Sequence, residues 1–75
     1  RQPGSAFKPV LYAAAIEKNP DNLLVRSYMG QALVEQGNVE LAEVQLSEIV
    51  ARGGAGTWPE TSLRTAIETG ETYSH

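Results

Sequence analysis

The chain has 75 residues, with nine acidic and six basic side chains and a formal net charge of −3, and it contains no cysteine. This length permits one small domain. An acidic chain without a basic stripe argues against nucleic acid as a partner, and the lack of cysteine excludes disulfides and thiolate metal sites. No apolar run reaches the ~18 residues of a membrane span, and no secretory signal precedes the body of the chain. We expect no membrane partner, metal or cofactor, and slightly favour a cytoplasmic location.

The first predicted helix covers residues 9–18. Leu11, Ala14 and Ala15 recur at three- and four-residue steps, which places them on one helix face. The segment 19–22 (Asn-Pro-Asp-Asn) ends this helix, because the residue before a proline avoids helical backbone angles. The aspartate or asparagine of the same segment can cap the next helix.

The second predicted helix covers residues 23–36, and the third covers residues 39–52. Gly37 lies between them and suits the left-handed conformation that ends many helices, and Asn38 suits the cap of the next helix. The apolar residues of the third helix recur at three- and four-residue steps, at Val39, Ala42, Leu46 and Ile49.

A glycine-rich segment, residues 53–56, interrupts the helical pattern before a fourth predicted helix over residues 59–69. Thr57 and Glu60 have the spacing of a capping box, in which each side chain bonds the backbone N–H of the other residue. Pro59 suits a first helical turn. The apolar side chains offered to a core are Leu63, Ala66 and Ile67, and Gly70 ends the helix.

Helices joined by short connections pack as antiparallel neighbours, and no segment alternates long enough to form a strand. We therefore predict an all-α domain of about four helices over residues 1–70, with a tail at residues 71–75. Trp58 is expected to pack over the end of the third helix. The alternative is that it is an exposed anchor for a partner, because tryptophan is enriched in binding hot spots.

The second and third predicted helices follow the spacing of a known repeat. Gly30 occupies the small place of a first helix, Gly37 the turn glycine, Ala42 the small place of a second helix, and Leu46 the bulky place after it. This spacing resembles the tetratricopeptide (TPR) repeat, a helix–turn–helix unit of about 34 residues. The resemblance implies one full repeat over residues 23–56, with a half repeat on either side.

The resemblance extends over residues 10–67 and departs from the family at Arg26 and Gly54, which replace its tryptophan and proline. It implies helix-packing roles for six residues: Tyr12, Ala15, Gly30, Leu33, Ala42 and Leu46. Gly30 and Ala42 are expected where the backbones of the second and third helices come close, because larger side chains would push these helices apart. The alternative is a helical bundle that is not a repeat.

The resemblance also implies a protein-interaction function. In TPR proteins the first helices line a groove that binds a peptide, and the corresponding outward-facing places are Leu24, Ser27, Gln31, Val34 and Glu35. The basic-and-asparagine clamp that some members use for a ligand carboxylate is absent, so we expect no partner held by an acidic C-terminus. A homo-oligomer or a structural cap is a further alternative, because about three repeats are normally needed for independent stability. These residues can also be plain solvated surface.

The segment 2–9 (Gln-Pro-Gly-Ser-Ala-Phe-Lys-Pro) resembles the S-x-x-K active-site stretch of penicillin-binding transpeptidases. The resemblance implies Ser5 as nucleophile and Lys8 as its base. No S-x-N element follows, and residues 68–70 (Glu-Thr-Gly) have the wrong charge for K-T-G. We therefore expect no enzyme, with Ser5 as a helix cap. The alternative is a transpeptidase fragment that carries only the serine–lysine helix.

Overall fold

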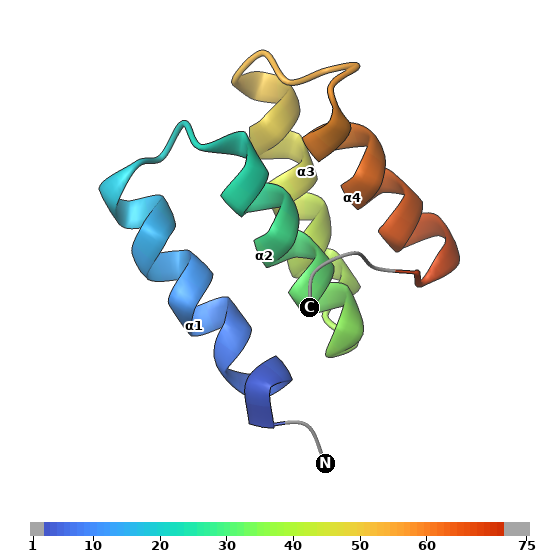
Figure 1. Ribbon diagram of the computed structural model, residues 1–75. Helices are drawn as coiled ribbons and strands as arrows, with labels where there is room; N and C mark the ends of the chain where they lie inside the picture. Colours follow the sequence, from blue (N-terminus) through green and yellow to red (C-terminus); the bar gives the residue numbers. More distant parts are fainter. Residues whose placement is uncertain (1–2, 72–75) are drawn as a thin grey trace.

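The computed structural model describes residues 3–71, with side chains described from residue 9 onward. Four helices follow one another: α1 (Pro3–Lys18), α2 (Leu23–Glu35), α3 (Val39–Ala51) and α4 (Trp58–Thr69). Figure 1 shows that consecutive helices run in opposite directions. No strand occurs within residues 3–71, so the prediction of an all-α array of about four helices is confirmed.

The largest difference in helix bounds is at the start of α1. This helix was expected to begin at Pro9, since proline suits a first helical turn, but α1 begins at Pro3 and contains Pro9 inside it. Pro3 meets the same first-turn preference. The other predicted bounds agree to within one residue, since α2 ends at Glu35, α3 ends at Ala51 and α4 begins at Trp58.

Three of the predicted helix ends have the expected local geometry. Asn22 caps α2, with its side-chain oxygen accepting a hydrogen bond from the Val25 N–H at 3.2 Å. Gly37 and Gly70 follow α2 and α4 with φ angles of 84° and 81°. Glycine adopts this left-handed conformation without the steric cost that a Cβ brings.

The predicted capping box at the start of α4 does not form, because the side chains of Thr57 and Glu60 bond other backbone groups. The Thr57 hydroxyl donates to the Gly54 carbonyl at 2.6 Å, and it does not cap the helix. Glu60 reaches back one residue further than expected, because its carboxylate accepts from the Gly56 N–H at 3.2 Å. The two side chains thus order the glycine loop before α4 instead of bonding each other's backbone.

The core lies between α2, α3 and α4. Its buried apolar members are Ala32, Leu33, Ala42, Ile49, Leu63 and Ala66. Among the described helices, α2 contacts all three others, α3 also contacts α4, and α1 contacts only α2. No described side chain of α1, over residues 9–18, is buried. Of the predicted packing residues, Leu33 and Ala42 are therefore core, whereas Tyr12, Ala15 and Leu46 are half-buried.

Gly30 is a point of close helix approach, but its neighbour differs from the predicted one. A Cβ at Gly30 would lie 2.6 Å from both δ-carbons of Leu63, which belongs to α4. The prediction placed Gly30 and Ala42 together where α2 and α3 come close, because both residues are small. The missing side chain at Gly30 instead admits Leu63, which is itself fully buried.

Gly54 fills a second tight place, in the loop between α3 and α4. It is buried, and a Cβ there would lie 2.6 Å from Ile49 Cγ2 and 2.8 Å from Leu23 Cδ1. A proline, which the TPR resemblance would place here, also carries a Cβ. The close packing of this loop under α2 and α3 therefore accounts for the departure from that pattern.

Candidate functional site

Three aromatic side chains form a row across α1, α2 and α4, and Tyr28 of α2 is its centre. The Tyr28 ring centroid lies 6.1 Å from that of Tyr12, in a tilted arrangement, and 6.1 Å from that of Trp58, edge-on. Aromatic pairs at such separations contribute about 0.5–1.5 kcal/mol beyond their buried area. The members of this aromatic row, Tyr12, Tyr28 and Trp58, therefore hold one another in place.

The aromatic row is partly open to solvent. The Trp58 side chain is 48% exposed, while Tyr12 and Tyr28 are half-buried. Leu24, which is 44% exposed, precedes Tyr28 by four residues, and the exposed Glu35 follows it by seven. These spacings put Leu24, Tyr28 and Glu35 on one stripe of α2. The exposed surface thus combines aromatic rings, an aliphatic side chain and a carboxylate.

Burial and neighbouring groups change the pKa of the Tyr12 phenol. Burial first, and then electrostatic interactions with Tyr28 and Glu35, raise the pKa of Tyr12 above its ordinary value of 10.0. Each of these causes disfavours the phenolate. Tyr12 therefore keeps its O–H at neutral pH.

The structure divides the predicted partner-binding residues into two groups. Leu24 and Glu35 are exposed and Val34 is half-buried. Ser27 and Gln31 have no exposed surface, so the prediction that they face outward is wrong. The reason is α4, which packs directly over this part of α2 and removes both side chains from solvent.

Ser27 and Gln31 belong instead to a buried polar cluster between α2 and α4. Gln31 Nε2 donates to Ser27 Oγ at 3.0 Å, and the Ser27 and Ser62 hydroxyls lie 3.0 Å apart. Gln31 Nε2 also lies 3.5 Å from Ser62 Oγ. Buried polar groups that satisfy one another in this way fix how two elements align. This polar cluster aligns α4 on α2 and offers no surface to a partner.

Sequence reasoning missed Tyr28 as a surface residue. Its spacing from Leu24 and Glu35 was a usable signal, but its two ring partners come from other helices, which spacing alone does not place. Trp58 was expected over the end of α3. The structure sets its ring edge-on to Tyr28 and leaves it 48% exposed, so the exposure that the alternative expects is present, while an anchoring role for a partner stays a prediction.

Arg26, at the place where the TPR pattern has tryptophan, is a buried structural cation. It is 7% exposed, its Nε donates to the Pro20 carbonyl at 2.8 Å, and its Nη1 donates to Gln45 Oε1 at 3.0 Å. Buried charged groups are tolerated when such hydrogen bonds replace water. Arg26 thereby joins the α1–α2 turn to α3.

The other described arginines are also engaged within the molecule. Arg52 forms ion pairs with Asp21 at 2.6 Å and with Glu48 at 3.3 Å. Arg64 pairs with Glu60, one turn before it on α4. Hydrogen bonds from Arg64 and then from the Gly56 N–H lower the pKa of Glu60 below its ordinary value of 4.5. These pairs leave a surface on which carboxylates outweigh cations.

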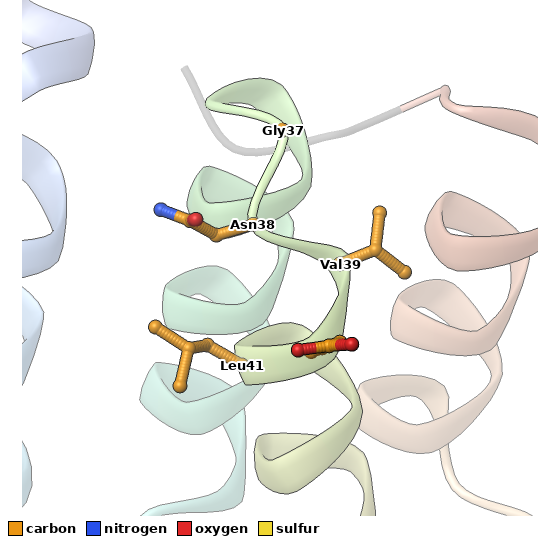
Figure 2. A pocket seen from close by; sticks show the side chains of 5 residues that line it. Gly37, Asn38, Val39 and Leu41 are labelled. Carbon is orange, nitrogen blue, oxygen red and sulfur yellow. The ribbon is translucent and has the colours of Figure 1, made fainter.

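A hollow of about 470 Å³ lies at the turn between α2 and α3, lined by residues 37–41. Figure 2 shows that Asn38 and Leu41 point to one side of the backbone, whereas Val39 points to the other, towards α4. Side chains that diverge from one short turn do not surround a ligand. We therefore assign no binding role to this hollow.

The S-x-x-K motif lies in the first part of α1, but the side chains of Ser5 and Lys8 are outside those that the structure describes. Residues 68–70, which stood in for K-T-G, lie at the other end of the chain, where α4 ends. The backbone of α1 is helical through Ser5 and Lys8. Their spacing therefore corresponds to one helical turn, as the motif requires.

Within residues 3–71, no group of three or more histidine, cysteine, aspartate or glutamate side chains is placed to hold a metal ion. None of the described helices has the length and apolar character of a membrane span. Comparisons with protein-family models, with curated proteins and with solved structures give no match. The function is therefore inferred from the contacts, exposure and charge of this chain itself.

Proposed function

We propose that the chain is a protein-interaction module of the TPR type and that its partner is a peptide segment bound along the aromatic row. The observation that carries this proposal is the row itself. Tyr12, Tyr28 and Trp58 come from three helices, hold one another in place, and remain partly exposed. Tyrosine and tryptophan are the residues most enriched in the energetic centres of protein interfaces.

The arrangement of the helices supports a repeat-type array. Among the described helices, α1 contacts only α2, while α4 contacts α2 and α3, as expected when each unit touches only its neighbours. The close approach of Leu63 to Gly30 joins α2 to α4, the helices at equivalent places of successive units. Tyr28 and Trp58 of the aromatic row belong to these two helices, and Tyr12 belongs to α1.

The physical advantage of the row is preorganisation. A binding surface made of rings already in contact loses little side-chain freedom when a partner arrives, because each ring is restrained before binding. A partner that covers Trp58 gains the burial of a large half-exposed side chain. The neighbouring Tyr28 is already packed between two rings and provides a firm support.

The test is to select peptides from a random library against the chain and to measure their affinity by calorimetry. Trp58→Ala should weaken the selected peptides about tenfold or more, the size expected for a hot-spot residue. Leu41→Ala removes a comparably exposed apolar side chain from α3, outside the row, and should leave the affinity unchanged. Selection of no peptide, or equal effects of the two variants, would contradict the proposal.

The competing function is a fragment of a penicillin-binding transpeptidase, and one observation favours it: residues 5 and 8 lie one turn apart in α1. A fluorescent penicillin acylates the serine of such a site covalently. We expect no labelling of the chain. Labelling that is lost in Ser5→Ala would replace the interaction module with the enzyme.

A further inference from the structure

The solvent-facing side of α3 carries a row of exposed apolar and small side chains. Leu41 and Val44 are 54% and 51% exposed. Ser47 and Ala51 follow them at three- and four-residue steps and are exposed as well. These spacings put the four residues on one stripe of the helix, the α3 stripe: Leu41, Val44, Ser47 and Ala51. The α3 stripe faces solvent because α2 and α4 pack against the opposite side of α3, where its buried residues lie.

The α3 stripe has the form of a surface on which another helix packs. Its first half offers the two branched side chains of Leu41 and Val44. Its second half is small, so the backbone of a second helix can come close there. The backbone groups inside α3 are bonded within the helix, so they offer no edge to an extended strand. The occupant that fits is therefore an amphipathic helix, which packs across the stripe and needs no enclosed hollow.

Unpaired carboxylates border the first half of the α3 stripe. Glu40 and Glu43 are exposed, and they are three residues apart, a spacing at which like charges on a helix repel. Within residues 9–71, the ion pairs use the carboxylates of Asp21, Glu48 and Glu60, and none involves Glu40 or Glu43. α3 itself contains no lysine or arginine. An arriving cation would therefore relieve this repulsion.

The cations of the described helices leave these two carboxylates unneutralised. Arg26, Arg52 and Arg64 are bonded to other groups within the molecule. Lys8 and Lys18 belong to α1, and α1 does not contact α3. Because consecutive helices are antiparallel, α1 and α3 run in the same direction (Figure 1), so Lys18 lies level with the end of α3 and away from its start. The start of α3 is thus an acidic surface with apolar side chains in it.

We infer that the α3 stripe is a second docking surface and that its occupant is a basic amphipathic helix of a partner protein. The apolar side chains of that helix cover Leu41 and Val44. Its lysine or arginine side chains, on the flank, pair with Glu40 and Glu43. A second copy of the chain does not fit, because its own α3 would bring the same carboxylates and its net charge is also −3. α3 carries no member of the aromatic row, so this surface goes beyond the proposed function.

The test uses a synthetic helical peptide with leucine at every third or fourth position and lysine on both flanks of the leucine stripe. In two copies of this peptide, every lysine is replaced by glutamine or by glutamate. We expect calorimetry to show that the glutamine copy binds about threefold to tenfold more weakly than the lysine peptide. The glutamate copy should not bind, because like charges would meet. A lysine peptide that does not bind, or binds no tighter than the glutamine copy, would overturn the inference.

Matched variants separate the α3 stripe from general attraction between a basic peptide and an acidic protein. Leu41→Gln removes an apolar side chain from the contact and should weaken the lysine peptide about tenfold. Val10→Gln changes an exposed apolar side chain of α1 and should have no effect. Glu43→Gln should weaken the lysine peptide about threefold and leave the glutamine copy unchanged, whereas Glu17→Gln, an exposed carboxylate of α1, is the control. Equal losses in a variant and its control would overturn the inference.

Two further measurements separate this surface from the aromatic row and from self-association. Trp58→Ala should leave the affinity for the lysine peptide unchanged, although it weakens the library peptides bound on the row. Loss of the lysine peptide in Trp58→Ala, but not in Leu41→Gln, would place that peptide on the row and overturn the inference. In sedimentation, Leu41→Gln should have the same mass as the wild-type chain. A dimer that Leu41→Gln separates would make the occupant a second copy and would also overturn it.

Discussion

α1 and α4 lie on opposite sides of α2 (Figure 1), yet they are held there in different ways. α4 buries Ser62, Leu63 and Ala66, and it meets α2 through the Gly30 approach and the polar cluster. α1 contributes only half-buried side chains, over residues 9–18. We conclude that α2, α3 and α4 form the well-packed part of the molecule and that α1 is attached to its edge.

The outward faces of the two helices differ as well. On α1, Val10 and Leu11 are 67% and 66% exposed. On α4, the exposed positions include Thr61, Arg64 and Glu68. Beyond the exposed Trp58 at its start, the outward face of α4 is thus more polar than that of α1.

Among the substitutions that test this comparison, Gly30→Leu should have the largest effect on stability. The new side chain would begin 2.6 Å from the δ-carbons of the buried Leu63, and its bulk would push α4 off α2. We expect a loss of about 3 kcal/mol in the free energy of unfolding, measured by urea denaturation. Ser47→Leu adds the same side chain at an exposed position of α3 and should change stability by less than about 0.5 kcal/mol. Equal stability of the two variants would refute the close approach.

The next test removes the polar cluster. Gln31→Ala deletes the donor that bonds the Ser27 hydroxyl and leaves a cavity between α2 and α4. We expect a loss of about 2 kcal/mol, from the lost hydrogen bond and the lost packing together. Gln36→Ala, an exposed glutamine at the end of the same helix, is the matched control. Similar stabilities in thermal unfolding would mean that Gln31 is not buried.

The smallest expected effect concerns the start of α4 and is seen in how the stability of the chain depends on pH. Because the pKa of Glu60 is lower in the folded chain than its ordinary 4.5, the folded state binds this proton less tightly than the unfolded state. The stability from Glu60 is therefore fully present above the ordinary pKa and is lost as the pH falls through the lowered one.

Between about pH 5 and pH 3, the Tm of the wild-type chain should therefore decline more steeply than that of Glu60→Gln. Glu68→Gln changes an exposed glutamate of the same helix and serves as the control. Parallel declines of the wild-type chain and Glu60→Gln would show that the pairing of Glu60 with Arg64 and Gly56 adds nothing to the stability of the fold.

Local rules predicted most of the fold, because helices begin and end for reasons that lie within a few residues. Gly37 and Gly70 end helices as their backbone freedom suggests, and Asn22 caps α2 with its side chain. The predicted start of α1 was wrong because Pro3 and Pro9 both suit a first helical turn. Only the structure shows that the helix begins at Pro3 and continues through Pro9.

The candidate site was harder to predict, because it depends on which helix covers which face. Spacing placed Ser27 and Gln31 on one stripe of α2, but it did not reveal that α4 covers that stripe. It likewise paired Gly30 with the following helix, although Leu63 lies nearest to it. Tyr28 was missed because its ring partners are distant in sequence, and such contacts are absent from any local pattern.

Native-state hydrogen exchange tests most directly the central claim, that α2 and α4 form a firm base beneath the aromatic row while α1 lies at its edge. The amides of α1 should exchange through openings that cost clearly less free energy than those of α2 around Gly30 and of α4 around Leu63. Protection in α1 equal to that of α2, or exchange of α4 before α1, would contradict the account.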